Sequence, residues 1–278
     1  TLIDTSLVQG QLQNALGYSL DETRALYGNY SACMDLYNLP SSLMVALTAS
    51  VIPAVSASIT QHNEKQTARI VRSSFRVTAL LAFPMGLGLW ALSGPIFRLF
   101  YPRYDGALGG QLLAVLGIAS IFVCLMLVTN SILQSYGRVN VPIVTMLIGG
   151  VVKIVLNYNL VAVPSVNIHG APIASLVCYT VSMAPNLYYV VKYAARRFPV
   201  TDIVLRPLAA TLAMGAVVWL LWQKLFTESY LSAGRGKLMI AVIVCVAAGI
   251  AVYVVCAVLF KAVRSEDLPA RLRRRAKR

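Results

Sequence analysis

An all-α, polytopic transmembrane helix bundle is the fold that this sequence predicts. Of its 278 residues, 58% are hydrophobic and only 12% are charged, whereas soluble domains carry roughly 45–50% apolar and about 25% charged residues. Long stretches contain no Asp, Glu, Lys or Arg: residues 36–63, 77–97, 106–137, 154–191, 207–223 and 238–260. Because about 20 mostly apolar residues cross a bilayer as a helix, these stretches predict repeated membrane crossings.

Each stretch gives one expected span, except that residues 154–191 are too long for one and are divided by the polar segment 164–170. A partial helix at 1–16 precedes the spans, which we place at 31–60, 75–99, 108–136, 142–163, 170–193, 204–224 and 238–260. We expect three regions: a transmembrane bundle at 1–198, two additional C-terminal transmembrane helices at 199–260, and a basic cytoplasmic tail at 261–278.

The distribution of Lys and Arg predicts the orientation of these spans. Seventeen of them fall on one side of the alternating layout and six on the other, while Lys153 lies inside a span. The positive-inside rule assigns the richer side to the cytoplasm, and the C-terminus with it. The net charge of +14 follows the same pattern, so we expect the tail to anchor on anionic lipid rather than to bind nucleic acid.

The remaining sequence features argue against an enzyme. His62 and His169 fall in connections on opposite sides of the membrane, the five cysteines lack CxxC spacing, and no nucleophile or phosphate-binding motif occurs. The sequence therefore predicts neither a metal nor a cofactor. Thr1 opens directly on the helical pattern with no signal peptide before it, so we expect a fragment of a larger protein.

Three ionisable residues fall within the expected helices: Asp4, Asp35 and Lys153. Charge at such depth is expensive and marks a candidate functional site. Asp4 begins a helix otherwise rich in Gln and Asn, including Gln11, which must face a wet cavity or other helices. Asp35 is close enough to the outer end of its helix to be an interfacial carboxylate instead. Lys153 shares a helical face with Asn157, although a lysine can also snorkel to the interface.

Prolines are the other unusual feature of the expected spans. Six of them lie within spans: Pro40, Pro53, Pro84, Pro95, Pro172 and Pro185. A proline removes a backbone donor and bends its helix, and transporters use such interrupted helices. The pattern favours a bundle that bends and rocks.

Short motifs follow one another in an order that resembles one family. They are LYGNY at 26–30, LYNLP at 36–40, VIPAVS at 51–56, ILQSYGR at 132–138, KIVLN at 153–157 and IHGA at 168–171. Together they resemble the C-terminal half of stage V sporulation protein B and its oligosaccharide-flippase relatives. That family belongs with the lipid II flippases and the multidrug and toxic-compound exporters. The match covers most of residues 1–195.

The resemblance implies a fourteen-helix transporter with two pseudo-symmetric lobes around a central cavity, in which this chain supplies helices seven to fourteen as one lobe. In lipid II flippases the last two helices form a groove for the lipid tail, and residues 204–260 are their counterpart. Those flippases carry an Arg facing the anionic substrate at the position of Asp35. That contact is absent from this chain.

The resemblance also implies a candidate ion site. Some lipid II flippases bind sodium through side chains whose counterparts here are Asp4, Asn157 and Ser175. A fourth ligand, an Asp, is replaced by Val161.

We therefore expect a flippase that moves an undecaprenyl-diphosphate-linked oligosaccharide or a peptidoglycan precursor across the bacterial plasma membrane by alternating access. Its expected partners are membrane lipid, the lipid-linked saccharide, the missing N-terminal half of the same protein and a coupling ion, Na⁺ or H⁺. The residues expected to line the substrate cavity are Asp4, Gln11, Asp35, Asn38, Gln134, Lys153 and Asn157.

Three alternatives stay open from the sequence. A cation-coupled drug exporter of the same superfamily would use Asp4 and Asp35 to bind cationic substrates. A non-transporting membrane scaffold would share the fold. A membrane-embedded enzyme such as a glycosyl transferase would need an acidic or His cluster at a membrane face, which the sequence does not show.

Overall fold

The computed structural model describes residues 2–194, 201–225 and 234–260. Within these ranges the chain is helical and contains no strand. The elements are α1 (Leu2–Asn14), α2 (Leu20–Thr60), α3 (Glu64–Ala91), α4 (Ser93–Phe100), α5 (Gly106–Ser135), α6 (Asn140–Val161), η1 (Asn167–His169), α7 (Gly170–Ala194), η2 (Thr201–Leu205), α8 (Arg206–Leu225) and α10 (Arg235–Leu259).

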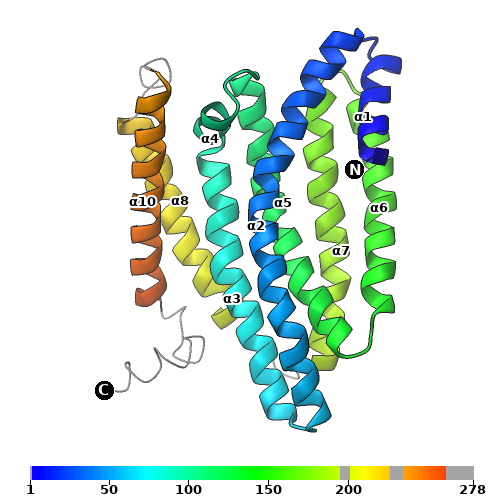
Figure 1. Ribbon diagram of the computed structural model, residues 1–278, viewed down its shortest axis with the longest axis vertical. Helices are drawn as coiled ribbons and strands as arrows, with labels where there is room; N and C mark the ends of the chain where they lie inside the picture. Colours follow the sequence, from blue (N-terminus) through cyan, green and yellow to red (C-terminus); the bar gives the residue numbers. More distant parts are fainter. Residues whose placement is uncertain (1, 195–200, 226–233, 261–278) are drawn as a thin grey trace.

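The helices stand side by side and alternate in direction (Figure 1). One end of the bundle carries the α2–α3 turn, the α5–α6 connection and the last turns of α7 and α10. The other end carries the α1–α2, α4–α5 and α6–α7 connections. We call the first the hairpin end, after the α2–α3 turn. This is the alternation that the distribution of Lys and Arg predicts.

Two helices are longer than the expected spans, because capping begins them outside the apolar runs. Ser19 and Glu22 form a capping box, in which the Ser19 N–H donates to Glu22 Oε2 at 2.9 Å, so α2 begins at Leu20. The Asn63 side chain accepts the Gln66 N–H at 3.0 Å, and α3 begins there rather than at residue 75. The same expected span, 75–99, is also broken at Leu92 into α3 and α4.

Four of the six prolines lie inside helices as expected: Pro40 and Pro53 in α2, Pro84 in α3 and Pro185 in α7. The other two do not interrupt a helix. Pro95 is the third residue of α4 and Pro172 the third residue of α7, where backbone N–H groups have no helical acceptor to lose. The expectation that all six prolines interrupt a helix is therefore wrong for Pro95 and Pro172.

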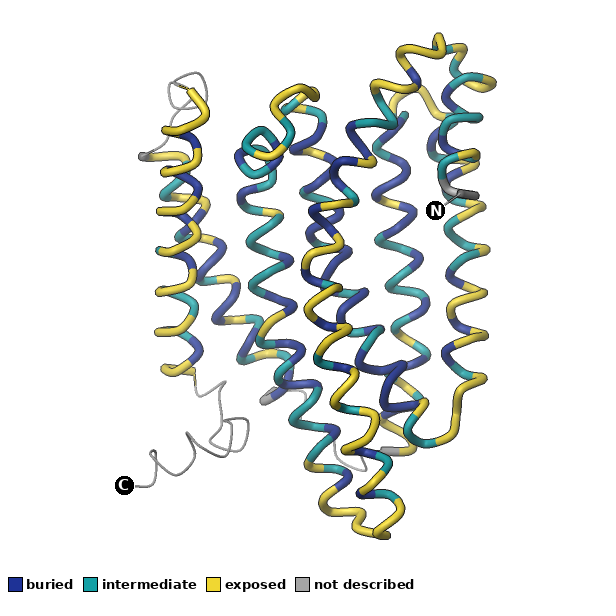
Figure 2. The backbone as a smooth tube through the Cα atoms, in the orientation of Figure 1, coloured by how far each residue is buried: buried dark blue, intermediate teal, exposed yellow. Residues whose placement is uncertain are grey.

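Helix α5 lies at the centre of the bundle and packs against α2, α3, α4 and α7. Figure 2 shows the buried residues concentrated along it, while the outer faces of α6 and α10 are exposed. Its close contact with α3 depends on two glycines. A Cβ on Gly86 would lie 2.7 Å from the Gly117 carbonyl oxygen, and a Cβ on Gly117 2.9 Å from that of Gly86. Small residues of this kind let membrane helices approach closely.

Six of the described helices are long and apolar enough to cross a membrane: α2, α3, α5, α6, α8 and α10. Helix α7 has 25 residues and is not among these six. Helices α8 and α10 pack on each other and on α3 and α4, away from α6 and α7 (Figure 1). The chain is therefore a multi-pass membrane protein.

Candidate functional site

Helix α2 exposes a polar face that no other described helix covers. Ser31, Asp35, Asn38 and Ser42 are all exposed and recur at intervals of three or four residues. At 3.6 residues per turn this spacing puts them on one side of the helix. We call these four residues the polar face of α2. A polar stripe in a spanning helix cannot lie against lipid at low cost, so it marks a surface for water, substrate or another protein lobe.

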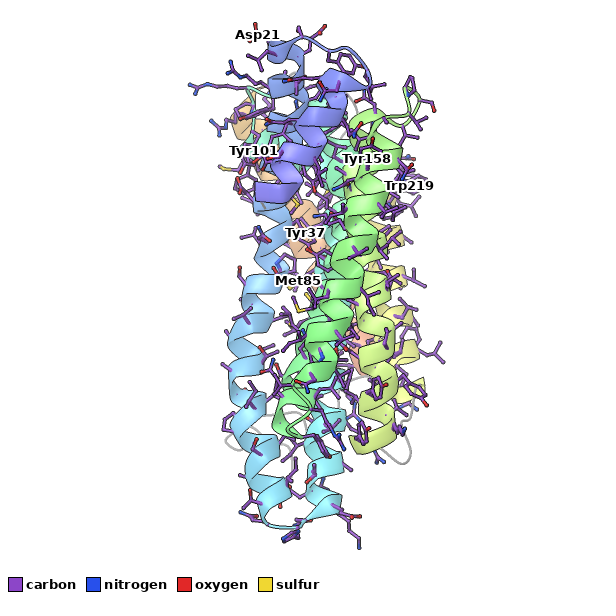
Figure 3. All side chains as sticks on the ribbon, turned by 90° about the vertical axis from the view of Figure 1, so that its right-hand side faces the viewer. Asp21, Tyr37, Met85, Tyr101, Tyr158 and Trp219 are labelled. Carbon is purple, nitrogen blue, oxygen red and sulfur yellow. The ribbon has the colours of Figure 1, made fainter. Side chains whose placement is uncertain are left out.

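Asp35 is held in place by the segment between α4 and α5. The Tyr101 hydroxyl donates a hydrogen bond to Asp35 Oδ2 at 2.9 Å, and the Tyr101 ring stacks on Phe97. Burial and then this bond to the carboxylate raise the pKa of Tyr101 to about 12, so the hydroxyl stays a donor at neutral pH. Figure 3 shows Tyr101 toward the end of the molecule that carries Asp21.

An apolar groove adjoins the polar face of α2. It encloses about 390 Å³ between α2, α3, α8 and α10, and every described lining residue except Tyr253 is apolar. The Tyr253 hydroxyl donates to the Leu80 carbonyl at 2.8 Å, so its polar atom is satisfied. Leu39 and Pro40 form the α2 wall of the groove and directly follow Asn38. The polar and the apolar surfaces therefore meet on one turn of α2.

Lys153 lies on the inward face of α6. That face repeats every four residues as Thr145, Gly149, Lys153, Asn157 and Val161, all buried except Lys153, which is half-buried. Asn157 is 1% exposed. The face turns toward α7 and α1, the helices against which α6 packs. Lys153 and Asn157 thus share a protein-facing surface rather than a lipid-facing one.

The other expected cavity residues are dispersed. Gln11 is half-buried on α1, and the side chain of Asp4 lies outside the described residues. Gln134 is exposed in the last turn of α5, at the hairpin end. Asp35 contacts Tyr101 near the other end, so the structure does not bring Gln134 and Asp35 together.

Two of the expected ion-site positions lie in tightly packed surroundings. Ser175 is fully buried on α7, where its hydroxyl donates to the Ala171 carbonyl at 3.1 Å and lies 3.4 Å from the Tyr30 hydroxyl. Val161 is 0% exposed in a cluster with Val8 and Leu12 of α1. Val161, which stands where the sodium-binding flippases carry an Asp, is thus packed among apolar side chains.

Sequence reasoning missed a buried polar network between α5, α6 and α7. Asn186 Nδ2 donates to Asn130 Oδ1 at 2.6 Å, and the Thr145 hydroxyl donates to Asn186 Oδ1 at 2.8 Å. The Ser182 hydroxyl donates to the Thr145 carbonyl at 3.2 Å. The sequence feature that could have indicated this network is an asparagine inside each of two charge-free runs, 106–137 and 154–191. Such bonds join helices inside a membrane.

Comparison with known proteins places this arrangement in a family. The family model described as lipid II flippase MurJ matches residues 2–256. The chain is 27% identical over 226 residues to lipid II flippase MurJ of Bacillus subtilis (strain 168), covering 80% of this chain and 41% of that protein. It is 25% identical over 252 residues to the uncharacterized membrane protein YabM of the same organism, covering 91% of this chain and 46% of that protein.

The fold is also found among solved structures. An outward-facing multidrug resistance MATE family transporter of the MOP superfamily superimposes with a TM-score of 0.59 at 18% identity, over 96% of this chain and 62% of that one. The chain spans less than half the length of the curated relatives it matches. With a family model that matches nearly all of its residues, the chain belongs to the lipid II flippase MurJ family.

Proposed function

We propose that this chain forms one lobe of a flippase that moves an undecaprenyl-diphosphate-linked oligosaccharide or peptidoglycan precursor across the bacterial plasma membrane. The observation that carries the proposal is the meeting of the apolar groove and the polar face of α2 at Asn38 and Leu39. In this proposal residues 1–198 form the lobe, residues 199–260 add the two helices that close the groove, and the tail at 261–278 lies at the cytoplasmic surface.

A lipid-linked saccharide needs both surfaces at once. Its head is polar and anionic, while its prenyl tail is apolar, so transport requires a wet path for the head beside a dry track for the tail. The tail already lies in hydrocarbon before it binds, and an apolar groove therefore contributes little affinity. The groove serves instead to hold the tail in register while the head moves along α2.

Alternating access is the mechanism that the helix geometry favours. Pro40 and Pro53 lie inside α2, and Pro40, which is buried, falls between Asn38 and Ser42 in the sequence. A helix with two such positions bends more readily than a straight one. In the two-lobe arrangement that we propose, the missing N-terminal half lies against the polar face of α2. A coupling ion, Na⁺ or H⁺, would supply the driving force.

Filling the apolar groove tests this proposal. A Cβ on Gly88, which lines the groove, meets no atom within 4 Å, so Gly88→Phe places a bulky side chain at the groove wall with open space around its first carbon. We expect this variant in the complete protein to fold normally and to lose at least about tenfold in flipping of lipid-linked substrate, or about 1.4 kcal/mol. The measurement is flipping in vesicles alongside protein level in the membrane.

The matched control is Gly150→Phe, because a Cβ there also meets no atom within 4 Å but lies on α6, away from the groove. It should transport as the parent protein does. Wild-type transport by Gly88→Phe would overturn the tail-groove assignment.

The proposed orientation places the hairpin end and the C-terminus in the cytoplasm. It depends on the 17 Lys and Arg residues on that side against six on the other. A reporter fused after Arg278 or inserted near His62 is expected to report cytoplasm, and one near Asp105 or Ser232 the outside. Measurement of enzymatic reporter activity in cells checks this, and a cytoplasmic signal at Asp105 would contradict the helix count.

A cation-coupled exporter is the second candidate, because Asp35 places an exposed carboxylate on the polar face of α2. A carboxylate attracts cationic drugs and repels a diphosphate. Export of a cationic dye that Asp35→Asn abolishes, with no flipping of lipid-linked saccharide, would favour this candidate.

A further inference from the structure

The hairpin end contains a second cavity, separate from the groove and from the polar face of α2. It encloses about 610 Å³ between the α2–α3 turn, the start of α3 and the ends of α5 and α7. Its wall carries three cationic side chains, Lys65, Arg72 and Lys192, against one carboxylate, Glu64. We call it the basic pocket. The excess of positive charge favours an anionic ligand.

Arg72, which lines the pocket, also carries an unsatisfied donor. The Nε–H of Arg72 is buried and has no hydrogen-bond acceptor among the described residues. A buried donor without an acceptor is costly, and in folded proteins nearly all such groups are paired with protein, water or ligand. A guanidinium offers several N–H groups in a planar fork, which matches the oxygens of a phosphate.

Aromatic and backbone features shape the same pocket. Arg138 stands over the Tyr193 ring at 5.0 Å and the Lys192 ammonium lies 5.8 Å from its centroid, so Tyr193 holds a further cation beside the pocket. At the turn, His62 has a φ of 51°, a conformation that non-glycine residues adopt rarely and mostly where the surrounding structure imposes it. His62 also lines the pocket.

The location narrows the chemistry of the ligand. The hairpin end carries the excess of Lys and Arg in the sequence, which corresponds to the leaflet where anionic phospholipids attract basic protein surfaces. Most of the residues that line the pocket are polar or charged, so it suits a head group.

We propose that the basic pocket binds a phosphate-bearing anion. Lys65 and Lys192 supply charge at the mouth, and Arg72 supplies a guanidinium in the wall. Two sources share this chemistry: the head group of an anionic membrane lipid, and a soluble phosphate compound in the cytoplasm. The proposal does not rest on transport, because the basic pocket is separate from both the groove and the polar face of α2.

Binding to the purified protein tests the proposal at constant ionic strength. The lipid arm counts phosphatidylglycerol bound by native mass spectrometry, with phosphatidylcholine as the neutral comparison. The soluble arm titrates sodium pyrophosphate by calorimetry into protein held in phosphatidylcholine nanodiscs. The test variant is the double substitution Lys65→Gln and Lys192→Gln, whose parent side chains are both exposed and whose loss therefore leaves the fold intact.

We expect the double variant to weaken binding at least about tenfold, because it removes two of the three cationic side chains in the pocket wall. Arg72→Gln should weaken it as well, and Lys224→Gln on α8, near the other end of the bundle, should change nothing. Binding in the lipid arm alone assigns the site to a head group, and binding in the soluble arm alone assigns it to a cytoplasmic phosphate. Absence of binding in both arms, or equal binding by the double variant and the parent, would overturn the proposal.

Discussion

Gly149→Leu should destabilise the protein strongly, whereas Gly150→Leu should leave it nearly unchanged. A Cβ on Gly149 overlaps the Ser182 hydroxyl and lies 3.0 Å from the Cys178 carbonyl oxygen, while a Cβ on Gly150 meets nothing within 4 Å. A leucine at position 149 therefore pushes α6 away from α7. Overpacking typically costs about 1–3 kcal/mol, and each buried polar group that loses its partner about 1–3 kcal/mol more.

The separation would break the bond between Thr145 and Asn186, which spans the same pair of helices. We expect the midpoint of thermal unfolding in detergent to fall by roughly 5–15 °C for Gly149→Leu, on the scale that applies to chains of this size. The two substitutions change helix propensity equally, so the neighbouring glycine is a matched control. Equal midpoints for the two variants would show that α6 and α7 do not pack as described.

Lys153→Ala should leave the protein level intact and abolish transport. A lysine near the bilayer centre costs about 2.5–3.5 kcal/mol on insertion scales, and Lys153 lies on the protein-facing side of α6, four residues before the buried Asn157. If the diphosphate of the substrate offsets this cost, removal of the cation removes the binding energy for the head. Complementation in cells and flipping in vesicles measure the loss.

Lys153→Arg keeps the positive charge but changes the shape of the side chain, and it should retain part of the activity. Lys224→Ala removes a lysine from the surface, and it should retain all of the activity. A second hypothesis is that the carboxylate of Asp4, rather than the substrate, compensates the charge of Lys153. In that case Lys153→Ala would lower protein stability, and a double variant with Asp4→Ala would restore it. Wild-type transport by Lys153→Ala would show that Lys153 has no role in transport and only extends its ammonium group toward the membrane surface.

The spans were predictable because apolar burial and lipid exposure both select charge-free runs. Their ends were not, because capping chemistry sets them. The Ser19–Glu22 box starts α2 at Leu20, eleven residues before the expected span. The basic stretch after Glu64 looked like a loop, yet it is the first part of α3, since nothing about Lys or Arg outside lipid opposes a helix.

Two residues of the polar face of α2, Asp35 and Asn38, were predicted as cavity residues, whereas Ser31 and Ser42 were not, although the spacing of three to four residues is visible in one segment. The contacts of these residues with other helices could not be predicted from the sequence. Tyr101 and Asp35 are 66 residues apart, and Asn130 and Asn186 are 56 apart, so their pairing depends on which helices are neighbours. Single-sequence patterns carry no such information. For the same reason Gln134 looked comparable with Asp35 in the sequence, although the two lie toward opposite ends of the bundle.

The buried polar bonds of α7 have a consequence for how the chain enters the membrane. Insertion by the translocon is decided segment by segment from apolarity, and α7 carries the polar residues Asn186 and Ser182 within its length. Its polar groups find their partners on α5 and α6, both of which are synthesised earlier. We expect nascent α7 to be held beside these two helices before it leaves the translocon. We therefore expect α5, α6 and α7 to assemble as one unit during biogenesis.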